Sequence, residues 1–221
     1  MIVLMSAFLL LSAFSCGGGN KANSTSEQSE ETAVNVPQFD ADSAYLYVKN
    51  QVDFGPRVPN TKEHVACGNY LAGQLEAFGA QVTNQYADLI AYDGTLLKAR
   101  NIIGSYKPES KKRIALFAHW DTRPWADNDP DEKNHNTPIL GANDGASGVG
   151  ALLEIARLVN QQQPELGIDI ILLDAEDYGA PQFYTGQHKE EFWCLGSQYW
   201  ARNPHVQGYN HVLAPARYGG R

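Results

Sequence analysis

The stretch from residue 112 to residue 159 constrains the fold of this chain more than any other. It opens with a run of five apolar residues, 114–118, which is too short for a helix and is bounded by charged residues. Such a run is typical of a strand buried on both faces, as in a parallel sheet. The run ends at His119 and Asp121, and after a polar loop the sequence Gly-Ala-Asn-Asp-Gly (141–145) leads into a helix with apolar residues at helical spacing. The stretch therefore predicts a buried strand, a loop and a covering helix.

A second buried strand is predicted further along the chain. Ile168 and the apolar residues 170–173 form this strand, which ends in the acidic sequence Asp-Ala-Glu-Asp at 174–177. In open α/β sheets, ligands bind outside the carboxyl ends of the strands, so both strand ends are expected at one functional rim. The side chains expected to meet at this rim are His119, Asp121, Asp144, Glu176 and Asp177.

The remaining elements complete a three-layer α/β domain with a mixed sheet. Apolar spacing, capping residues and an Asp-Gly hairpin signal define them. We expect helices at 40–54, 61–78, 145–161 and 190–202, and strands at 81–92, 96–106, 113–119 and 168–174. No strand pattern follows the last helix, so we expect the domain (37–210) to be incomplete at its C-terminal end and to be followed by an aberrant tail, 211–221.

The N-terminal segment is predicted to be a targeting signal. Residues 2–14 are apolar but too short to span a bilayer, and they run into Ser15 and Cys16. This pattern resembles a bacterial lipoprotein signal (1–16), in which Cys16 becomes lipidated; an ordinary cleaved signal is the alternative. Residues 17–36, rich in Ser, Asn, Glu and Gly, are then a disordered tether. We therefore expect a cell-envelope protein, either a membrane-anchored lipoprotein or a periplasmic protein.

Composition limits the partners. The chain of 221 residues is 43% hydrophobic, enough for one domain with a core, and its net charge of −8 argues against nucleic-acid binding. Contact with a membrane is expected only through an N-terminal lipid anchor. Export would permit a disulfide between Cys67 and Cys194, although two free thiols are equally compatible with the sequence.

Three motifs together resemble the glutaminyl cyclases and the related co-catalytic zinc aminopeptidases. They are AHWDTRPWADND (118–129), GANDGASGVGALLE (141–154) and LLDAEDYG (172–179), and the resemblance runs from about residue 40 to about residue 210. The run WDTRPW is most similar to cyclases of bacterial cell envelopes. The resemblance implies a zinc-exopeptidase-like fold and a partial catalytic domain.

The resemblance also implies roles for the rim residues. Asp144 corresponds to a zinc ligand, and Asp177 corresponds to the next zinc ligand, a position usually occupied by Glu. Glu176 corresponds to the catalytic acid/base, and Asp121 to an aspartate held near the metal. His119 corresponds to a ligand of the second zinc in the aminopeptidases, so its role as a ligand stays open.

Aromatic residues near the motifs are candidates for the substrate pocket. These candidates are Trp120, Trp125 and Trp193, with core packing as an alternative for Trp193.

Other polar residues have simpler interpretations. Asp144 could cap a helix, Asp174 could be an ordered strand-end carboxylate, and residues 127–132 are expected to form a solvated loop because they lack the spacing of a calcium loop. His64, His135, His188, His205 and His211 are expected at the surface or in loops.

The function implied by the resemblance is zinc-dependent glutaminyl-peptide cyclotransfer, with one Zn²⁺ and with peptides or proteins that begin with Gln as substrates. The first alternative is an aminopeptidase with two zinc ions, which would need a carboxylate directly after Asp144, where this chain has Gly145. The second alternative is an inactive fragment, because the family's third ligand is a His further toward the C-terminus. We expect the chain as written to bind zinc weakly and to lack cyclase activity, because structural and catalytic zinc normally takes at least three protein ligands.

Overall fold

The computed structural model describes residues 35–206. The predicted signal with Cys16, most of the tether and the tail at 211–221 lie outside the described residues, so these remain predictions. Within the described part of the chain, no helix has both the length and the apolar character needed to cross a membrane.

Four strands form one mixed sheet in the described residues. They are β1 (Gln81–Ile90), β2 (Leu96–Tyr106), β3 (Arg113–His119) and β4 (Gly167–Leu173). Their order in the sheet is β1-β2-β4-β3, in which β2 is antiparallel to both β1 and β4 while β3 and β4 are parallel. The antiparallel hairpin at one edge of the sheet and the parallel pair at 113–119 and 168–174 confirm the predicted arrangement.

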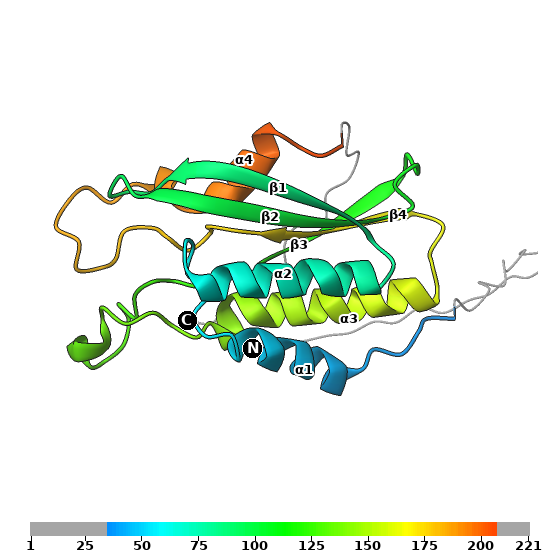
Figure 1. The fold of residues 1–221 in the computed structure, drawn as a ribbon, viewed down its shortest axis with the longest axis horizontal. Coiled ribbons are helices and arrows are strands. Elements are labelled where there is room, and N and C mark those ends of the chain that lie inside the picture. Colours follow the sequence, from blue (N-terminus) through cyan, green and yellow to red (C-terminus); the bar gives the residue numbers. More distant parts are fainter. Residues whose placement is uncertain (1–34, 207–221) are drawn as a thin grey trace, which may run out of the picture. The chain divides into compact units, whose positions relative to one another are not determined.

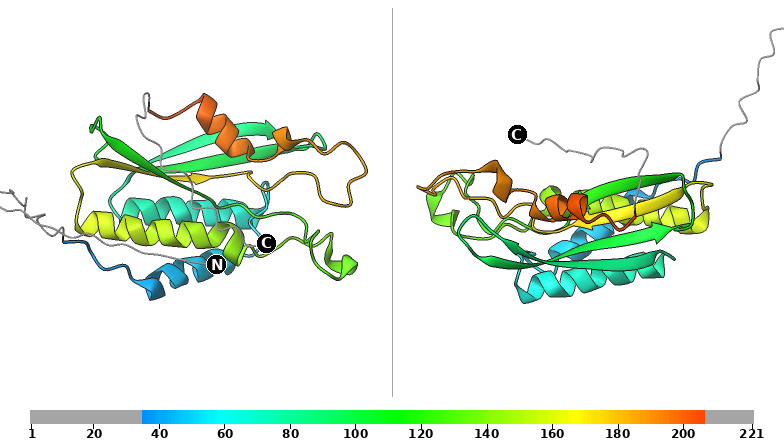
Figure 2. Two further views of the ribbon diagram at one scale, coloured as in Figure 1. Left: turned by 180° about the vertical axis from the view of Figure 1, so that it is seen from behind. Right: turned by 90° about the horizontal axis from the view of Figure 1, so that it is seen from above.

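Helices cover both faces of the sheet (Figure 1). The helices α1 (Ala41–Val52), α2 (Lys62–Ala77) and α3 (Ser147–Gln161) lie on one side, where α1 packs on α3. The helix α4 (Leu195–Arg202) lies on the other side, as the view from behind in Figure 2 shows. Helices, sheet and helix make the three layers that the sequence predicts.

Capping residues fix the starts of the first two helices. The side chain of Asp40 accepts hydrogen bonds from the backbone N–H groups of Asp42 and Ser43, and Thr61 accepts one from His64 N. These bonds satisfy N–H groups that have no partner inside the helix. After α2, Gly79 adopts φ +78°, a left-handed conformation that glycine reaches without steric strain.

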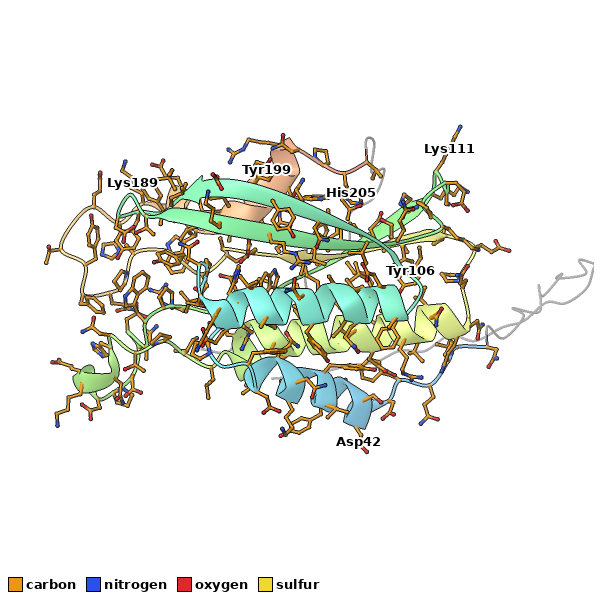
Figure 3. The ribbon with its side chains drawn as sticks, in the orientation of Figure 1. Asp42, Tyr106, Lys111, Lys189, Tyr199 and His205 are labelled. Carbon is orange, nitrogen blue, oxygen red and sulfur yellow. The ribbon has the colours of Figure 1, made fainter. Side chains whose placement is uncertain are left out.

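The main core lies between the sheet and the helices α2 and α3. Its fully buried side chains include Ile102, Ile170, Leu172, Leu71, Leu75 and Leu153. Tyr106 reaches down from β2 into this layer, and its hydroxyl donates to the carbonyl of Ala156 (Figure 3). Burial of these side chains supplies the main force that holds the helices on the sheet.

A smaller core lies under α4. Ile103, Ile171 and Leu173 point to this side of the sheet, and Trp200 of α4 packs edge-on against Phe117 with ring centroids 5.0 Å apart. Tyr199 and His205 mark the same side in Figure 3. This contact, together with the packing of α4 on β1 and β2, holds α4 and the residues at its N-terminus against the sheet.

Two predictions about these elements were wrong in detail. The strand β3 is not buried on both faces: only Ala115 is fully covered, because within the described residues β3 pairs with β4 alone. The last helix does not start at residue 190. A short 3₁₀ turn, Glu190–Phe192, comes first, and the chain then bends at Cys194 with φ +55° before α4 begins.

The contact between α1 and α3 can be tested by two matched glycine substitutions. A Cβ at Gly150 would lie 2.7 Å from Val48 Cγ2 and 2.8 Å from the carbonyl of Ala44, whereas a Cβ at Gly73 of α2 would meet nothing within 4 Å. We predict that Gly150→Ala lowers the free energy of unfolding by about 1 kcal/mol or more through overpacking. Gly73→Ala should raise it by about 0.4–1 kcal/mol. Urea titrations measure both, and equal effects would contradict this packing.

Candidate active site

The carboxyl ends of β3 and β4 lie side by side and form the predicted rim. His119, the last residue of β3, is in register with Leu173, the last residue of β4. The loops that follow both strands extend from this end of the molecule, where Lys189 is labelled in Figure 3, while Lys111 marks the opposite end. All five predicted rim residues therefore lie on β3 or on segments that follow the carboxyl ends of β3 and β4.

Asp121 organises the acidic pair that follows β4. Its side chain is fully buried, and its carboxylate accepts hydrogen bonds from Glu176 N at 3.2 and 3.1 Å and from Asp177 N at 3.2 Å. Two backbone N–H groups thus converge on one carboxylate, which holds the backbone of residues 176 and 177 in place. Asp121 therefore supports the backbone of Glu176 and Asp177 and is itself shielded from solvent.

A strained turn sends Glu176 and Asp177 to different environments. Ala175 has φ +53°, a left-handed conformation that is uncommon for residues other than glycine and is found at functional sites. Glu176 accepts hydrogen bonds from Ser197 N and Ser197 Oγ, both at 2.7 Å. Asp177 instead lies 3.7 Å from Arg123 Nη1. The neighbouring carboxylates are therefore free to take separate roles.

Both carboxyl groups of the pair bind protons more readily than usual. Burial raises the pKa of Glu176 to about 7, and the charge of Asp121 adds to this effect. Burial, together with the charges of Asp121 and Asp144, raises the pKa of Asp177 to about 7. Negative charges are thus crowded at the rim in a poorly solvated setting.

His119 lies between two of these carboxylates. Its Nε2 is 3.0 Å from Asp144 Oδ1, and its Nδ1 is 3.5 Å from Asp121 Oδ1. The latter distance is too long for a good hydrogen bond, and the buried Nδ1 has no hydrogen-bond partner among the described residues. Burial lowers the pKa of His119, but its two acidic neighbours outweigh this and raise the pKa to about 11. In turn, the hydrogen bond from His119 lowers the pKa of Asp144.

Asp144 is not a helix cap. It lies in a wide helical turn, Ala142–Ala146, with non-helical backbone angles (φ −91°, ψ 107°), and its side chain turns to His119. The next residue, Gly145, has φ +96°, and a Cβ there would lie 2.9 Å from the carbonyl oxygen of Asp121. The fold therefore requires glycine where a two-zinc aminopeptidase would place a second carboxylate.

A cavity of about 520 Å³ opens beside these residues. Its lining residues are Arg123, Asp127, Asn128, Asp144, Asp177, Ala180, Gln182, His188 and Trp193. Arg123 binds both oxygens of Asp127, at 2.7 and 2.6 Å, and its guanidinium lies over the rings of Trp125 and Trp193 at 5.5 and 4.8 Å. Asp127 is buried by this ion pair, so the prediction that it lies in a solvated loop was wrong.

The three candidate tryptophans have different positions. Trp193 lines the cavity, and Trp125 stands behind Arg123, packed edge-on against Tyr178 at 5.3 Å. Trp120 lies elsewhere: it is fully buried, and its Nε1 donates to the carbonyl of Arg100. It cannot line the cavity, because its neighbours in the core cover it on all sides.

Beneath the rim, a buried pair supports the end of β4. His64 Nε2 is 2.9 Å from both carboxylate oxygens of Asp174, and the His64 ring stacks on Trp120 with centroids 4.3 Å apart. Burial raises the pKa of Asp174. His64 is therefore not the surface residue that we expected, whereas Asp174 is the ordered strand-end carboxylate that we expected.

Cys67, on the same helix as His64, is a buried free thiol and does not pair with Cys194.

Sequence reasoning missed one further support, Arg57. This fully buried side chain donates to the carbonyl groups of Trp120 at 3.1 Å, Leu140 at 2.7 Å and Gly141 at 2.9 Å. It thereby connects the loop after β3 to the turn that carries Asp144. The only signal in the sequence is a charged residue in a loop otherwise rich in proline and glycine, residues 55–60.

The rim residues suit a metal cation in their donor chemistry. Carboxylate oxygens and imidazole nitrogens are zinc ligands, and Asp144, Asp177 and His119 bring both kinds of donor to the rim. Asp144 and Asp177 both face the cavity. Within residues 35–206, no three His, Cys, Asp or Glu side chains are arranged as a complete metal site. Asp144 and Asp177 thus fit as two ligands of such an ion.

The family of this chain follows from comparison with known proteins. Residues 101–214, more than half of the chain, match the model of peptidase family M28, and the chain belongs to this family. A crystal structure of the glutaminyl cyclase of Bacteroides thetaiotaomicron, bound to N-acetylhistamine, is 91% identical with a TM-score of 0.79; the match covers 82% of this chain and 62% of that one.

Two further structures have similar scores. A leucine aminopeptidase precursor from Bacteroides thetaiotaomicron VPI-5482 is also 91% identical, with a TM-score of 0.80 and coverage of 82% and 62%. A Zn-dependent exopeptidase from Parabacteroides distasonis is 61% identical, with a TM-score of 0.79 and coverage of 82% and 61%. These matches confirm the zinc-exopeptidase-like fold and imply zinc as the cofactor. The chain spans about 62% of the length of the solved relatives.

The role of Arg57 can be tested by removing its charge. We predict that Arg57→Met lowers the free energy of unfolding by about 3 kcal/mol or more, because it leaves the buried carbonyl contacts of Trp120 and Gly141, and the partly buried one of Leu140, without their donor. Arg202→Met, an exposed change in the last turn of α4, should alter it by less than about 0.5 kcal/mol. Urea unfolding followed by circular dichroism measures both. Equal effects of the two substitutions would show that Arg57 does not hold the rim.

Proposed function

We propose that these residues form the active site of a zinc-dependent glutaminyl-peptide cyclotransferase, which converts an N-terminal glutamine to pyroglutamate and releases ammonia. One observation carries the proposal: Glu176 is held by Ser197, while the adjacent Asp177 lines the cavity together with Asp144. This arrangement separates an acid/base from two metal ligands. The 91% identity to a protein solved as a glutaminyl cyclase supports it.

In the proposed reaction, Glu176 moves the protons. The N-terminal amine of the substrate attacks the carbon of its own side-chain amide, so one C–N bond forms and one breaks. Glu176 accepts a proton from the amine and delivers it to the leaving nitrogen, which departs as ammonia. The reaction is intramolecular, so the site has mainly to hold the substrate in a bent conformation.

The metal would be held by Asp144 and Asp177, with one zinc ion in the site. When bound, zinc supplies a Lewis acid that polarises the amide carbonyl. Asp121 keeps the backbone of both Glu176 and Asp177 in place from beneath. His119 orients Asp144 through the 3.0 Å contact from its Nε2.

One large aromatic side chain, Trp193, lies among the mostly polar residues that line the cavity. Trp193 lines the cavity, and the guanidinium of Arg123 fixes its ring from behind. The same guanidinium lies 5.5 Å from the centre of the Trp125 ring. We propose Trp193 as a direct substrate contact, with Trp125 as its support.

An aminopeptidase is the second candidate, because one relative with 91% identity bears that name and His119 lies next to Asp144. That reaction would use two zinc ions and a water nucleophile. The tight approach of Gly145 to Asp121 leaves no room for the extra carboxylate that this chemistry would need. The structure therefore favours the cyclase.

A chimera provides the test: the matched 82% of this chain replaces the matched 62% of the Bacteroides thetaiotaomicron glutaminyl cyclase. We predict that it binds one zinc per chain and converts a peptide that begins with Gln to the pyroglutamyl peptide, with release of ammonia. Glu176→Gln should keep the zinc and lose on the order of 10²–10⁴-fold in kcat, because the proton shuttle is gone. Asp144→Ala should lose the zinc itself.

Mass spectrometry of the product, ammonia release and elemental analysis of the protein decide the outcome. Asp88→Asn, an exposed change on the hairpin, is the control and should alter neither zinc content nor turnover. Release of a free amino acid with two zinc ions bound would favour the aminopeptidase. Unchanged turnover in Glu176→Gln would remove Glu176 from the mechanism.

A further inference from the structure

Ser197, at the start of α4, has the most specific contact with the proposed acid/base. Its backbone N–H donates to Glu176 Oε1 and its hydroxyl donates to Glu176 Oε2, each at 2.7 Å. Two donors of one residue thus bind the two oxygens of one carboxylate. This two-point contact fixes the plane of the carboxylate as well as its distance, which a single hydrogen bond would not do.

Hydrogen bonds from neighbouring segments, and not only the contact with the Glu176 carboxylate, fix the position of Ser197. Cys194 N donates to the carbonyl of Glu176 at 2.9 Å, and Leu195 N donates to the carbonyl of Ala175 at 3.1 Å. Asn101 of β2 accepts from Asp174 N and donates to the carbonyl of Gly196. The first turn of α4 is therefore attached to the chain on either side of Ala175.

Gly196 permits this close approach. A Cβ at that position would lie 2.0 Å from the carbonyl oxygen of Asp174, so a side chain there would push α4 away from the rim. The left-handed bend at Cys194 (φ +55°) turns the chain so that the N–H of Ser197 points at Glu176. Because Ser197 N is one of the N–H groups that have no partner within the helix, it is available for this role.

We propose that Ser197 is the positioning residue of the acid/base: it holds the carboxylate of Glu176 in the one orientation in which a lone pair of each oxygen is directed to the substrate. This inference rests on the proposed function of Glu176. A carboxylate oxygen accepts at two lone-pair sites, so binding by Ser197 occupies one site on each oxygen and leaves the other available. Glu176 can then receive a proton from the amine and release it to the leaving nitrogen without rotating.

The test compares variants in the chimera described above. Ser197→Ala should lower kcat about tenfold or more and leave KM nearly unchanged, because it misplaces the base without altering the substrate pocket. Ser197→Thr, which keeps the hydroxyl, should restore most of the lost kcat. Ser105→Ala is the matched control: Ser105 Oγ donates to a buried carboxylate, Asp169, at 2.6 Å but lies far from the rim on β2. It should leave kcat and KM unchanged.

A second measurement separates this inference from the proposed function. In the 221-residue chain, thermal melts of Ser197→Ala, Glu176→Gln and the double variant form a cycle that requires no activity. If Ser197 holds Glu176, the effects of the two changes on the melting temperature are not additive. Loss of pyroglutamate formation in the unmodified chimera would refute the proposed function alone. Additive changes in the melting temperature, or an unchanged kcat in Ser197→Ala, would overturn the positioning role.

Discussion

The buried carboxylate of Asp121 is the interaction on which the rim depends. It accepts the backbone N–H groups of both Glu176 and Asp177, and so connects the end of β3 to the turn that follows β4. It acts next to the left-handed residue Ala175, which is itself held by hydrogen bonds to the Asp174 carboxylate and from Leu195 N. The geometry of the acid/base and of the proposed ligand Asp177 therefore comes from a residue that does not itself face the cavity.

The same arrangement explains why the site suits a cation. The fold gathers several carboxylates where water has little access, and burial makes their negative charges unfavourable. His119, whose pKa is raised by its acidic neighbours, is placed to offer compensating positive charge next to Asp144. A zinc ion bound by Asp144 and Asp177 would supply that charge instead. Relief of the repulsion between these carboxylates would therefore contribute to the free energy of metal binding.

Much of this could be predicted from the sequence because the signals were local. Apolar runs, caps and the Asp-Gly hairpin identified the strands and helices, and the rule for strand ends placed His119 and Glu176 at one rim. The supports were missed because they are contacts between distant segments. The role of Ser197 depends on a bend at Cys194, that of Arg57 on carbonyl groups about 63 to 84 residues away, and that of His64 on Asp174. No periodicity in the sequence reveals such contacts.

The central claim is that neighbouring carboxylates have separate duties, one for the metal and one for protons. Anomalous diffraction at the zinc edge, from crystals of the chimera, tests it most directly. The account predicts one zinc ion, bound by carboxylate oxygens of Asp144 and Asp177, with Glu176 still on Ser197 and outside the coordination sphere. An ion bound by Glu176, or a second ion bound by His119, would contradict the account.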